Sequence, residues 1–276
     1  MANPRIAIFA RLANGNVAPA RVIEGTHTRL SRTSHAIAFD EKNDEIAVPN
    51  PLAEAILIFR GSASGDEAPI RTIQGPRTLL QENDELALDN VHDELIVPTR
   101  QAILVFSRLA NGDVAPLRII AGPKTKINRA RGVAVDPVNN IIAIGNSDPQ
   151  GILIFNRTDQ GDVAPRSIIS GPKTGIYTTK GFTVNPGRKE LIATVEARGV
   201  QVSRNLGESF VGIWNYTDNG DVPPKGAIKG DATRLIAPRG AALDLRHQEI
   251  FVIDKVQNAF FAYSWDKVLQ GANPSK

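Results

Sequence analysis

The stretch that decides the fold covers residues 103–145 and reads ILVFSRLANGDVAPLRIIAGPKTKINRARGVAVDPVNNIIAIG. Its short apolar runs are separated by residues that favour turns. Runs such as Ile103-Leu104-Val105-Phe106 are apolar at every position, which indicates strands buried on both faces. We name the four expected strands of one unit a to d. Examples are residues 132–136 (a), 141–145 (b), 152–155 (c) and 166–169 (d).

The same pattern occurs five times along the chain. Each copy contains a glycine in an Asn/Ser/Gln-Gly-Asn/Asp turn, and these glycines are 50, 47, 49 and 59 residues apart. They are Gly15, Gly65, Gly112, Gly161 and Gly220. A period near fifty with four strands per unit is typical of β-propeller blades.

The copies predict an all-β chain that forms a single β-propeller domain over residues 1–276, built from four-stranded blades. Strand a occurs five times, which favours five blades, and strand c occurs six times, so that one c-like strand is surplus. We expect an N-terminal strand to pair with the C-terminal blade and close the ring, since an unpaired sheet edge is an association site. The surplus c strand also suggests self-association through terminal strands. The predicted repeats are about 5–24 (partial), 35–74, 85–121, 131–170, 180–229 and 239–263 (partial).

Composition excludes several classes of function. Lys and Arg number 32 against 29 Asp and Glu, and aromatic residues make up 5%, so neither a basic run nor an aromatic platform indicates nucleic-acid binding. Cysteine is absent, which excludes disulfides, thiolate metal sites and cysteine nucleophiles. No stretch approaches the roughly 20 apolar residues that a membrane span needs. No zinc-protease, nucleophile-elbow or P-loop motif is present.

The first residues, MANPRIAIF, lead directly into strand-like sequence and do not resemble a signal peptide. Either the protein is not exported or its signal has been removed. A chain without cysteine suits a bacterial secreted protein as well as many cytosolic ones. The compartment stays open, with an extracellular or periplasmic location as the favoured expectation.

The most conspicuous motif is the NGDVAP hairpin between strands c and d. Its oxygen-rich turns, such as those at 159–162 and 218–221, suggest a calcium loop, but the alternating ligand spacing and the final bidentate Glu are missing. Asn-Gly and Asp at such places are typical of turns with positive φ. We therefore predict turns. The threonine that follows in each Gly-Pro-Lys-Thr-like link is expected to satisfy backbone groups.

When the repeats are aligned, positions at which one copy differs from the others are candidates for a functional site. The two aligned positions at the start of strand a hold charged residues and a histidine. In a propeller, strand a is the innermost strand and lines the central channel. These residues are therefore expected to ring one mouth of the channel, which the b–c loops, including the long one at 196–210, also reach. They serve either charge balance or a polar ligand site for a small anionic ligand or another protein. The predicted site residues are His35, Asp84, Glu85, Arg131, Lys180 and Arg239.

The units GVAVDPVNNIIAIGNSDPQGILIF (132–155) and GAALDLRHQEIFVIDKVQNAFFAY (240–263) resemble the NHL-type repeats of bacterial propeller proteins. The resemblance implies a scaffold family, mostly of binding or interaction proteins, with some lyase and lactonase relatives. The long NGDVAP hairpins depart from that pattern, and so do the five innermost strands, since six are common in the family; the resemblance therefore leaves six blades as the alternative. No catalytic residue is carried over.

Two hypotheses of function follow from this resemblance. The first is a non-catalytic binding or interaction scaffold that needs no cofactor. The second is a calcium-dependent lactonase-like hydrolase or lyase, because Asn50, Glu85, Asn146 and Asp254 resemble the axial calcium ligands of such relatives. Three nearby cations argue against the metal.

Overall fold

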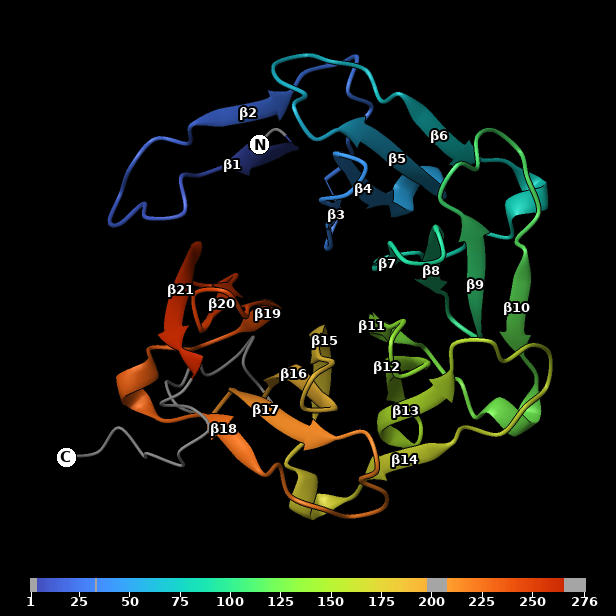
Figure 1. Cartoon of the computed structure of the whole chain (residues 1–276), viewed down its shortest axis with the longest axis vertical. Helices are drawn as coiled ribbons and strands as arrows, with labels where there is room; N and C mark the ends of the chain where they lie inside the picture. The colour runs from blue at the N-terminus through green and yellow to red at the C-terminus, as the bar shows by residue number, and fades with distance from the viewer. Residues whose placement is uncertain (1–3, 33, 198–207, 266–276) are drawn as a thin grey trace. The chain divides into compact units, whose positions relative to one another are not determined.

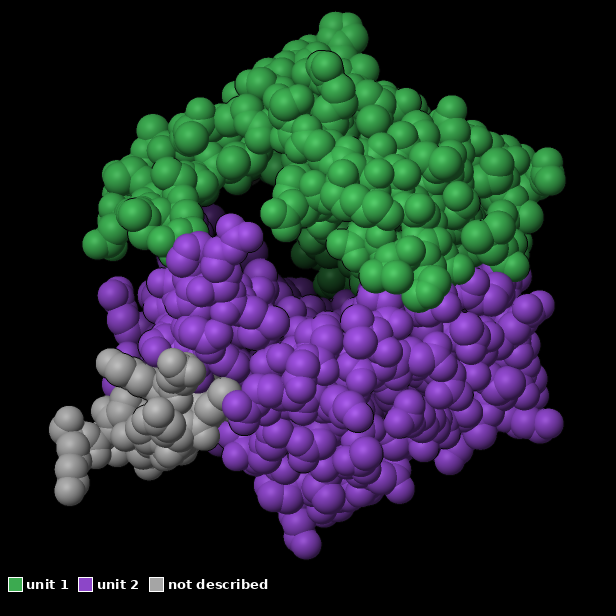
Figure 2. Space-filling model, viewed as in Figure 1, with its two compact units in different colours: residues 1–99, 104–117 green, residues 100–103, 118–276 purple. Residues whose placement is uncertain are grey.

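The computed structural model describes residues 4–32, 34–197 and 208–265, which contain strands β1 to β21 and short 3-10 helices η1 to η5 (Figure 1). The predicted all-β class is confirmed. None of the described helices has the length and hydropathy of a membrane span. The chain divides into two compact units, residues 1–99 with 104–117 and residues 100–103 with 118–276 (Figure 2). Each unit is described by itself.

The first unit begins with a two-stranded sheet and continues with a complete four-stranded antiparallel sheet. Its strands are β1 (Arg5–Ile8), β2 (Arg21–Glu24), β3 (Ala38–Asp40), β4 (Glu45–Asn50), β5 (Ala55–Arg60), β6 (Arg71–Gln74), β7 (Ala87–Asp89) and β8 (Glu94–Pro98), with most of β9 (Ala102–Ser107). Its short helices are η1 (Pro51–Ala53) and η2 (Pro76–Thr78).

The second unit holds two complete four-stranded sheets, β11-β12-β13-β14 and β15-β16-β17-β18, and the three-stranded sheet β19-β20-β21. Its strands are β10 (Arg118–Ala121), β11 (Arg131–Asp136), β12 (Ile141–Ser147), β13 (Gln150–Asn156), β14 (Ser167–Ser170), β15 (Thr178–Asn185), β16 (Glu190–Glu196), β17 (Phe210–Asn215), β18 (Gly226–Ile228), β19 (Pro238–Asp244), β20 (Glu249–Asp254) and β21 (Ala259–Ser264). Its short helices are η3 (Pro123–Thr125), η4 (Pro172–Thr174) and η5 (Asp231–Thr233).

The predicted strand order a-b-c-d is the hydrogen-bonded order of each complete sheet. Strand a is β3, β7, β11, β15 and β19, which confirms five innermost strands in the described residues. Both terminal c-type segments are strands, since β1 pairs with β2 and β21 with β20. Closure of a ring through the N-terminal strands would join the two units and stays a prediction.

The expectation that His35 and Glu85 open strand a is wrong, because β3 begins at Ala38 and β7 at Ala87. The neighbouring strands explain the shortening. Pro49 and Pro98 stand near the ends of β4 and β8, and a proline has no N–H to donate to the ladder. The innermost strands β11, β15 and β19 face no such proline and run for six to eight residues.

The fully apolar strands are buried on both faces, as predicted. Every residue of β13 from Ile152 to Phe155 has no exposed surface, and the same holds for Ile103, Val105 and Phe106 of β9. Side chains from successive sheets meet in shared clusters; Ile154 and Ile169 of one sheet pack with Leu191 and Trp214 of the next. The core therefore lies between blades.

The NGDVAP hairpins attach each blade to the one before it in the chain. Gly161 donates its N–H to the carbonyl of Ile119 at 2.7 Å and accepts from the N–H of Ala121 at 3.1 Å. This lays the hairpin along the outer edge of strand d of the preceding blade. The equivalent bridges are Gly65 on β2, Gly112 on β6 and Gly220 on β14.

The aspartate and threonine of the repeat complete this attachment. Oδ1 of Asp162 accepts the N–H of Lys124 at 2.7 Å, so the hairpin caps the start of η3. A Cβ on Gly122, which has φ +128, would lie 2.5 Å from the carboxyl carbon of Asp162. Thr125 donates to the carbonyl of Gly122 and accepts from the N–H of Ile127, which confirms the predicted role of the threonine.

Candidate functional site

The three predicted site residues of the first unit are engaged with neighbours. His35 Nδ1 lies 3.7 Å from Asp84 Oδ1, and both side chains are partly exposed. Glu85 also takes part in an interaction. This arrangement agrees with the charge-balance hypothesis for these positions.

Two of the three predicted cations of the second unit are also neutralised or enclosed. Arg239 Nε lies 3.2 Å from Glu196 Oε1, and Lys255 Nζ lies 3.8 Å from the same oxygen. Arg239 and Glu196 are close enough to form an ion pair, but the geometry of their contact is not that of a hydrogen bond. Lys180 is buried and takes part in an interaction of its own. Most of the long b–c loop, residues 198–207, lies outside the described residues.

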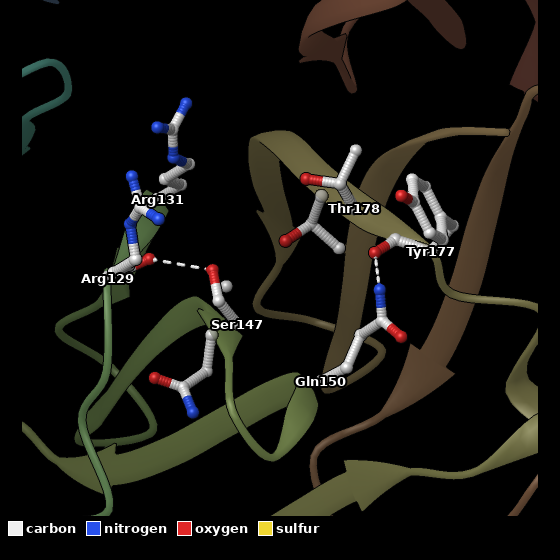
Figure 3. A pocket seen from close by; sticks show the side chains of 9 residues that line it. Arg129, Arg131, Ser147, Gln150, Tyr177 and Thr178 are labelled. Carbon is white, nitrogen blue, oxygen red and sulfur yellow. Dashed lines mark hydrogen bonds between the residues drawn. The ribbon is translucent and has the colours of Figure 1, made fainter. Parts of the chain in front are cut away.

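Arg131 lines a small polar pocket between two successive blades of the second unit (Figure 3). The cavity measures about 50 Å³, and a single water needs roughly 10–15 Å³. It therefore has room for a few water-sized groups. The lining residues are Arg129, Arg131, Gly145, Asn146, Ser147, Gln150, Tyr177, Thr178 and Thr179.

The two arginines form one side of the pocket. Figure 3 shows the Arg129 and Arg131 side chains on the same side of the pocket, with Tyr177 and Thr178 across from them. No carboxylate lines the pocket. Among the described residues, neither guanidinium has an ion pair or hydrogen bond, in contrast to Arg239. Within the described part of the chain, no carboxylate therefore compensates the two positive charges of the pocket.

Local backbone features position these arginines. The pairing of β11 with β12 shifts register between Arg131 and Val133, so Gly132 forms a bulge with φ +72. A bulge re-aims the neighbouring side chain. A Cβ on Gly132 would lie 2.4 Å from the carbonyl oxygen of Lys180, so only glycine fits this approach of the two blades.

The floor of the pocket depends on another glycine. A Cβ on Gly145 would lie 1.9 Å from Oγ1 of Thr179 and 2.3 Å from the carbonyl oxygen of Arg131. The equivalent positions of the other blades hold larger residues, namely Pro49, Pro98, Thr194 and Ile253. A small residue at this column therefore occurs only in the blade whose edge forms the pocket.

Hydrogen bonds hold the remaining lining in place. Ser147 Oγ donates to the carbonyl of Arg129 at 3.3 Å, and Gln150 Nε2 donates to the carbonyl of Tyr177. Asn146 bonds to backbone groups of the link before β11, through its Oδ1 to the N–H of Asn128 at 2.7 Å. Among the described residues, the hydroxyl groups of Tyr177 and Thr178 bond to no other group. They could donate to a ligand.

Three of the four candidate calcium ligands bond to backbone groups, and the fourth, Glu85, takes part in another interaction. Asn50 Nδ2 donates to the carbonyl of Arg29 at 2.8 Å, and Asp254 Oδ2 accepts the N–H groups of Ile236 and Ala237. Asn146 Oδ1 accepts the N–H of Asn128, and Asn146 Nδ2 donates to the carbonyl of Lys126. Within residues 4–32, 34–197 and 208–265, no three His, Asp or Glu side chains cluster as metal ligands.

Comparison with known proteins identifies the fold and no family. No family model matches the chain, and no curated protein matches it. A chain of a nidogen/laminin complex superimposes with a TM-score of 0.61 at 15% identity, covering 84% of this chain and 76% of that one. A putative 6-phosphogluconolactonase from Bacteroides uniformis gives 0.58 at 13%, covering 93% and 72%.

The Cps50 (Swd1) β-propeller domain of Myceliophteria thermophila gives a TM-score of 0.54 at 12% identity, covering 81% of this chain and 63% of that one. The chain has the β-propeller fold. At these identities the likeness shows the fold alone. The NHL resemblance of the repeats is not demonstrated by these matches.

Sequence reasoning found Arg131 and the b–c loop residue Asn146 but missed Arg129, Gln150 and the Tyr177–Thr178 edge. Arg129 stands two residues before Arg131 in the segment RARG (129–132). This spacing could have indicated that both side chains lie on the same side of the segment. Tyr177 and Thr178 belong to the next blade, and no local pattern indicates that they face Arg131.

Proposed function

We propose that this protein is a non-catalytic binding or interaction propeller that takes a small oxyanion group in the pocket of Arg129 and Arg131. The observation that carries the proposal is the pair of guanidinium groups without a carboxylate in the same cavity. Two cations that line one small cavity repel each other unless an anion compensates them. An arginine fork donates bidentate bonds to carboxylate, sulfate or phosphate oxygens.

The size of the pocket supports a single oxyanion group rather than a whole sugar or nucleotide. A cavity of about 50 Å³ accommodates the charged group, and the rest of the ligand would project into solvent. A carboxylate or sulfate on a larger molecule, including an acidic side chain of another protein, fits this description. Similarity to a chain from a nidogen/laminin complex is consistent with a binding role.

The alternative is a calcium-dependent lactonase-like hydrolase or lyase. It draws support from the similarity to a putative 6-phosphogluconolactonase, which extends over 93% of this chain. The backbone roles of Asn50, Asn146 and Asp254 weigh against it. Thermal unfolding with and without Ca²⁺ separates the two hypotheses, because a metal that binds only the folded state raises Tm.

Calorimetry with sulfate, phosphate, acetate and citrate at low ionic strength tests the anion site, since salt screens exposed charges. We expect Arg131→Met to weaken binding about 10- to 100-fold, because a hydrogen bond to a charged group contributes roughly 1.5–3 kcal/mol. Arg246→Met removes the same charge from an exposed turn and should leave affinity unchanged. Equal heats in wild type and Arg131→Met, or none in either, would refute the proposal.

A further inference from the structure

A row of cations leads away from the pocket along the link that connects β10 and β11. Lys124, Lys126 and Arg129 are exposed, and Arg131 is half-buried in the pocket itself. In the part of the chain that the structure describes, none of these four side chains forms an ion pair or a hydrogen bond. The pocket is therefore one end of a longer basic surface.

Hydrogen bonds fix this link beside the pocket. Thr125 Oγ1 accepts the N–H of Ile127, and Asn146, which lines the pocket, donates to the carbonyl of Lys126 at 3.0 Å. Asn128 bonds to the end of β12 through both its N–H and its carbonyl. A ligand therefore meets cations on a backbone that is already ordered, which lowers the entropy cost of binding.

The other links of the repeat do not offer the same row. Leu79 and Gly175 occupy the position of Lys126 in two copies, and Arg29 does so in a third. The guanidinium of Arg29 already donates to Thr72 at 3.2 Å. In the last copy the equivalent arginine lies over a phenylalanine ring. The row is thus specific to the blade whose edge forms the pocket.

Two acidic residues adjoin the row without cancelling it. Asp162 Oδ1 caps the N–H of Lys124 at 2.7 Å, and Asp148 is exposed in the turn between β12 and β13. Neither lines the pocket. Two carboxylates against the four cations of the row leave the surface positive.

The row is longer than a single anionic group. Lys126 and Arg131 are five residues apart, which is at most about 18 Å along the chain. The cavity of about 50 Å³ takes only one charged group. A ligand that carries further anionic groups along its length would place them over the lysines, and each such contact would add to its affinity.

The rim of the pocket has the chemistry of a sugar site. Tyr177 is 44% exposed and offers an apolar ring face. Among the described residues, the side-chain oxygens of Gln150 and Asn128 bond to no group, so they can accept bonds from hydroxyl groups. The carboxylates of an acidic peptide only accept hydrogen bonds, whereas sugar hydroxyls also donate them. Because the backbone at Lys126 and Asn128 is already bonded, a peptide could not pair with it as a strand.

We propose that the ligand is a polyuronate, a polysaccharide whose sugar units each carry a carboxylate. One carboxylate would occupy the pocket of Arg129 and Arg131, where a guanidinium fork matches its planar geometry. Neighbouring units would lie over Lys126 and Lys124. This inference rests on the proposed function, because it takes the same pocket as the anchor of the chain.

Calorimetry at low ionic strength tests the inference with galacturonate and mannuronate, each as a monomer and as a tetramer. In at least one series the tetramer should bind at least about tenfold more tightly than the monomer, beyond the roughly fourfold statistical gain from four equivalent carboxylates. Lys126→Gln should weaken tetramer binding about two- to fivefold, as expected for an exposed ion pair, and affect the monomer less.

Lys189→Gln is a matched control. Lys189 is an exposed lysine with φ +55, and Lys126 is one with φ +57. Lys189 follows β15, whose first residue, Thr178, lines the pocket, so it lies beyond the far end of that strand. This variant should bind the tetramer like wild type, and equal losses in Lys126→Gln and Lys189→Gln would contradict the inference.

The outcomes distinguish this inference from the proposed function. If Arg131→Met weakens monomer binding but neither tetramer binds more tightly than statistics allow, the anion site stands and the polyuronate ligand is overturned. If neither monomers nor tetramers bind, both are overturned. If tetraglutamate binds as tightly as the better tetramer, the protein reads charge alone, which would contradict a sugar ligand in favour of an acidic peptide.

Discussion

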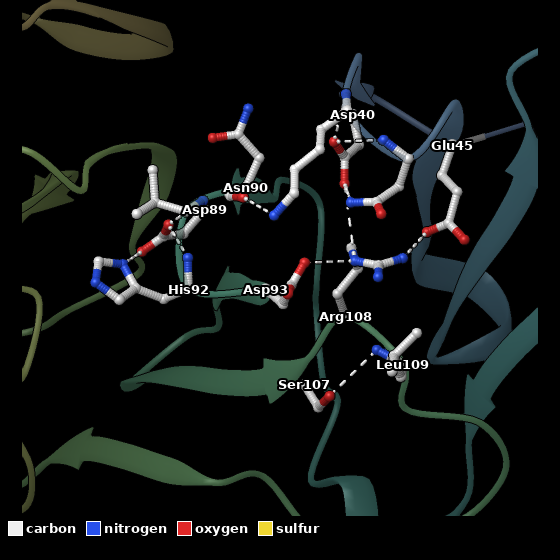
Figure 4. Close-up of polar contacts among 12 residues, drawn as sticks. Asp40, Glu45, Asp89, Asn90, His92, Asp93, Ser107, Arg108 and Leu109 are labelled. Atoms are coloured by element: carbon white, nitrogen blue, oxygen red, sulfur yellow. Dashed lines mark hydrogen bonds and ion pairs between the residues drawn. The ribbon is translucent and has the colours of Figure 1, made fainter.

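At the scale of single residues, the first unit depends on Arg108, which connects carboxylates of two blades. Its Nη1 lies 2.8 Å from Glu45 Oε2, and its Nε lies 2.9 Å from Asp93 Oδ1 (Figure 4). Arg71 Nη2 binds the same Glu45 oxygen at 2.7 Å. The Arg108 side chain is only 11% exposed, so solvent screens these contacts less than those of a surface pair.

Replacing Arg108 by methionine should destabilise the protein by about 2 kcal/mol, because Asp93 loses its guanidinium partner and the largely buried Glu45 keeps only Arg71. The control is Arg60→Met. Arg60 pairs with Glu67 at 2.6 Å but is 60% exposed, and such surface pairs contribute roughly 0–1 kcal/mol. Urea unfolding measures both. Losses of equal size would contradict the role given to burial.

The same cluster predicts a pH dependence. Burial alone would raise the pKa of Glu45, but hydrogen bonds from Arg71 and Arg108 outweigh it and hold the pKa below its ordinary value. The hydrogen bond from Arg108 likewise lowers the pKa of Asp93. A carboxylate with a lowered folded pKa stabilises the protein above its unfolded pKa, near 4, and loses that contribution as pH falls.

The stability difference between wild type and Arg108→Met should therefore shrink between about pH 6 and pH 3. Urea titrations at several pH values measure it. A difference that stayed constant over this range would show that the guanidinium stabilises the fold by packing alone.

At the scale of elements, the aspartate of each bridged hairpin completes the interblade attachment. Asp162→Ala removes the cap on the η3 N–H of Lys124 and should cost about 1 kcal/mol, as loss of a helix cap does. Asp162→Asn keeps an acceptor oxygen and should cost less. Urea unfolding compares the two variants. If both variants lost the same stability, the negative charge rather than the hydrogen bond would be responsible.

The strands and turns could be predicted from sequence because their determinants are local. Fully apolar runs specify buried strands, and Asn-Gly pairs specify the turns. The partner of Asp162 could not be predicted, because the N–H of Lys124 lies 38 residues away and no pattern near the aspartate indicates it. The shortening of β3 was missed for a similar reason, since it depends on Pro49 of the neighbouring strand.

At the scale of the whole molecule, alignment of the repeats identified charged residues that could bind a ligand. It did not show which of them are paired with a carboxylate. Arg131 and Arg239 hold equivalent positions, yet Glu196 pairs with Arg239 while Arg131 has no such partner among the described residues. Glu196 stands at the end of β16, outside the blade of Arg239. Which charge remains available for a ligand is thus set by contacts between blades, which a single sequence does not reveal.

The most direct test of the proposed anion site is anomalous diffraction from crystals soaked in selenate, a tetrahedral oxyanion with a heavy central atom. We expect an anomalous peak between the guanidinium groups of Arg129 and Arg131, and its loss in Arg131→Met crystals of the same form. Selenate ordered elsewhere on the chain but absent from this pocket, or a peak that persists in Arg131→Met, would contradict the proposed site.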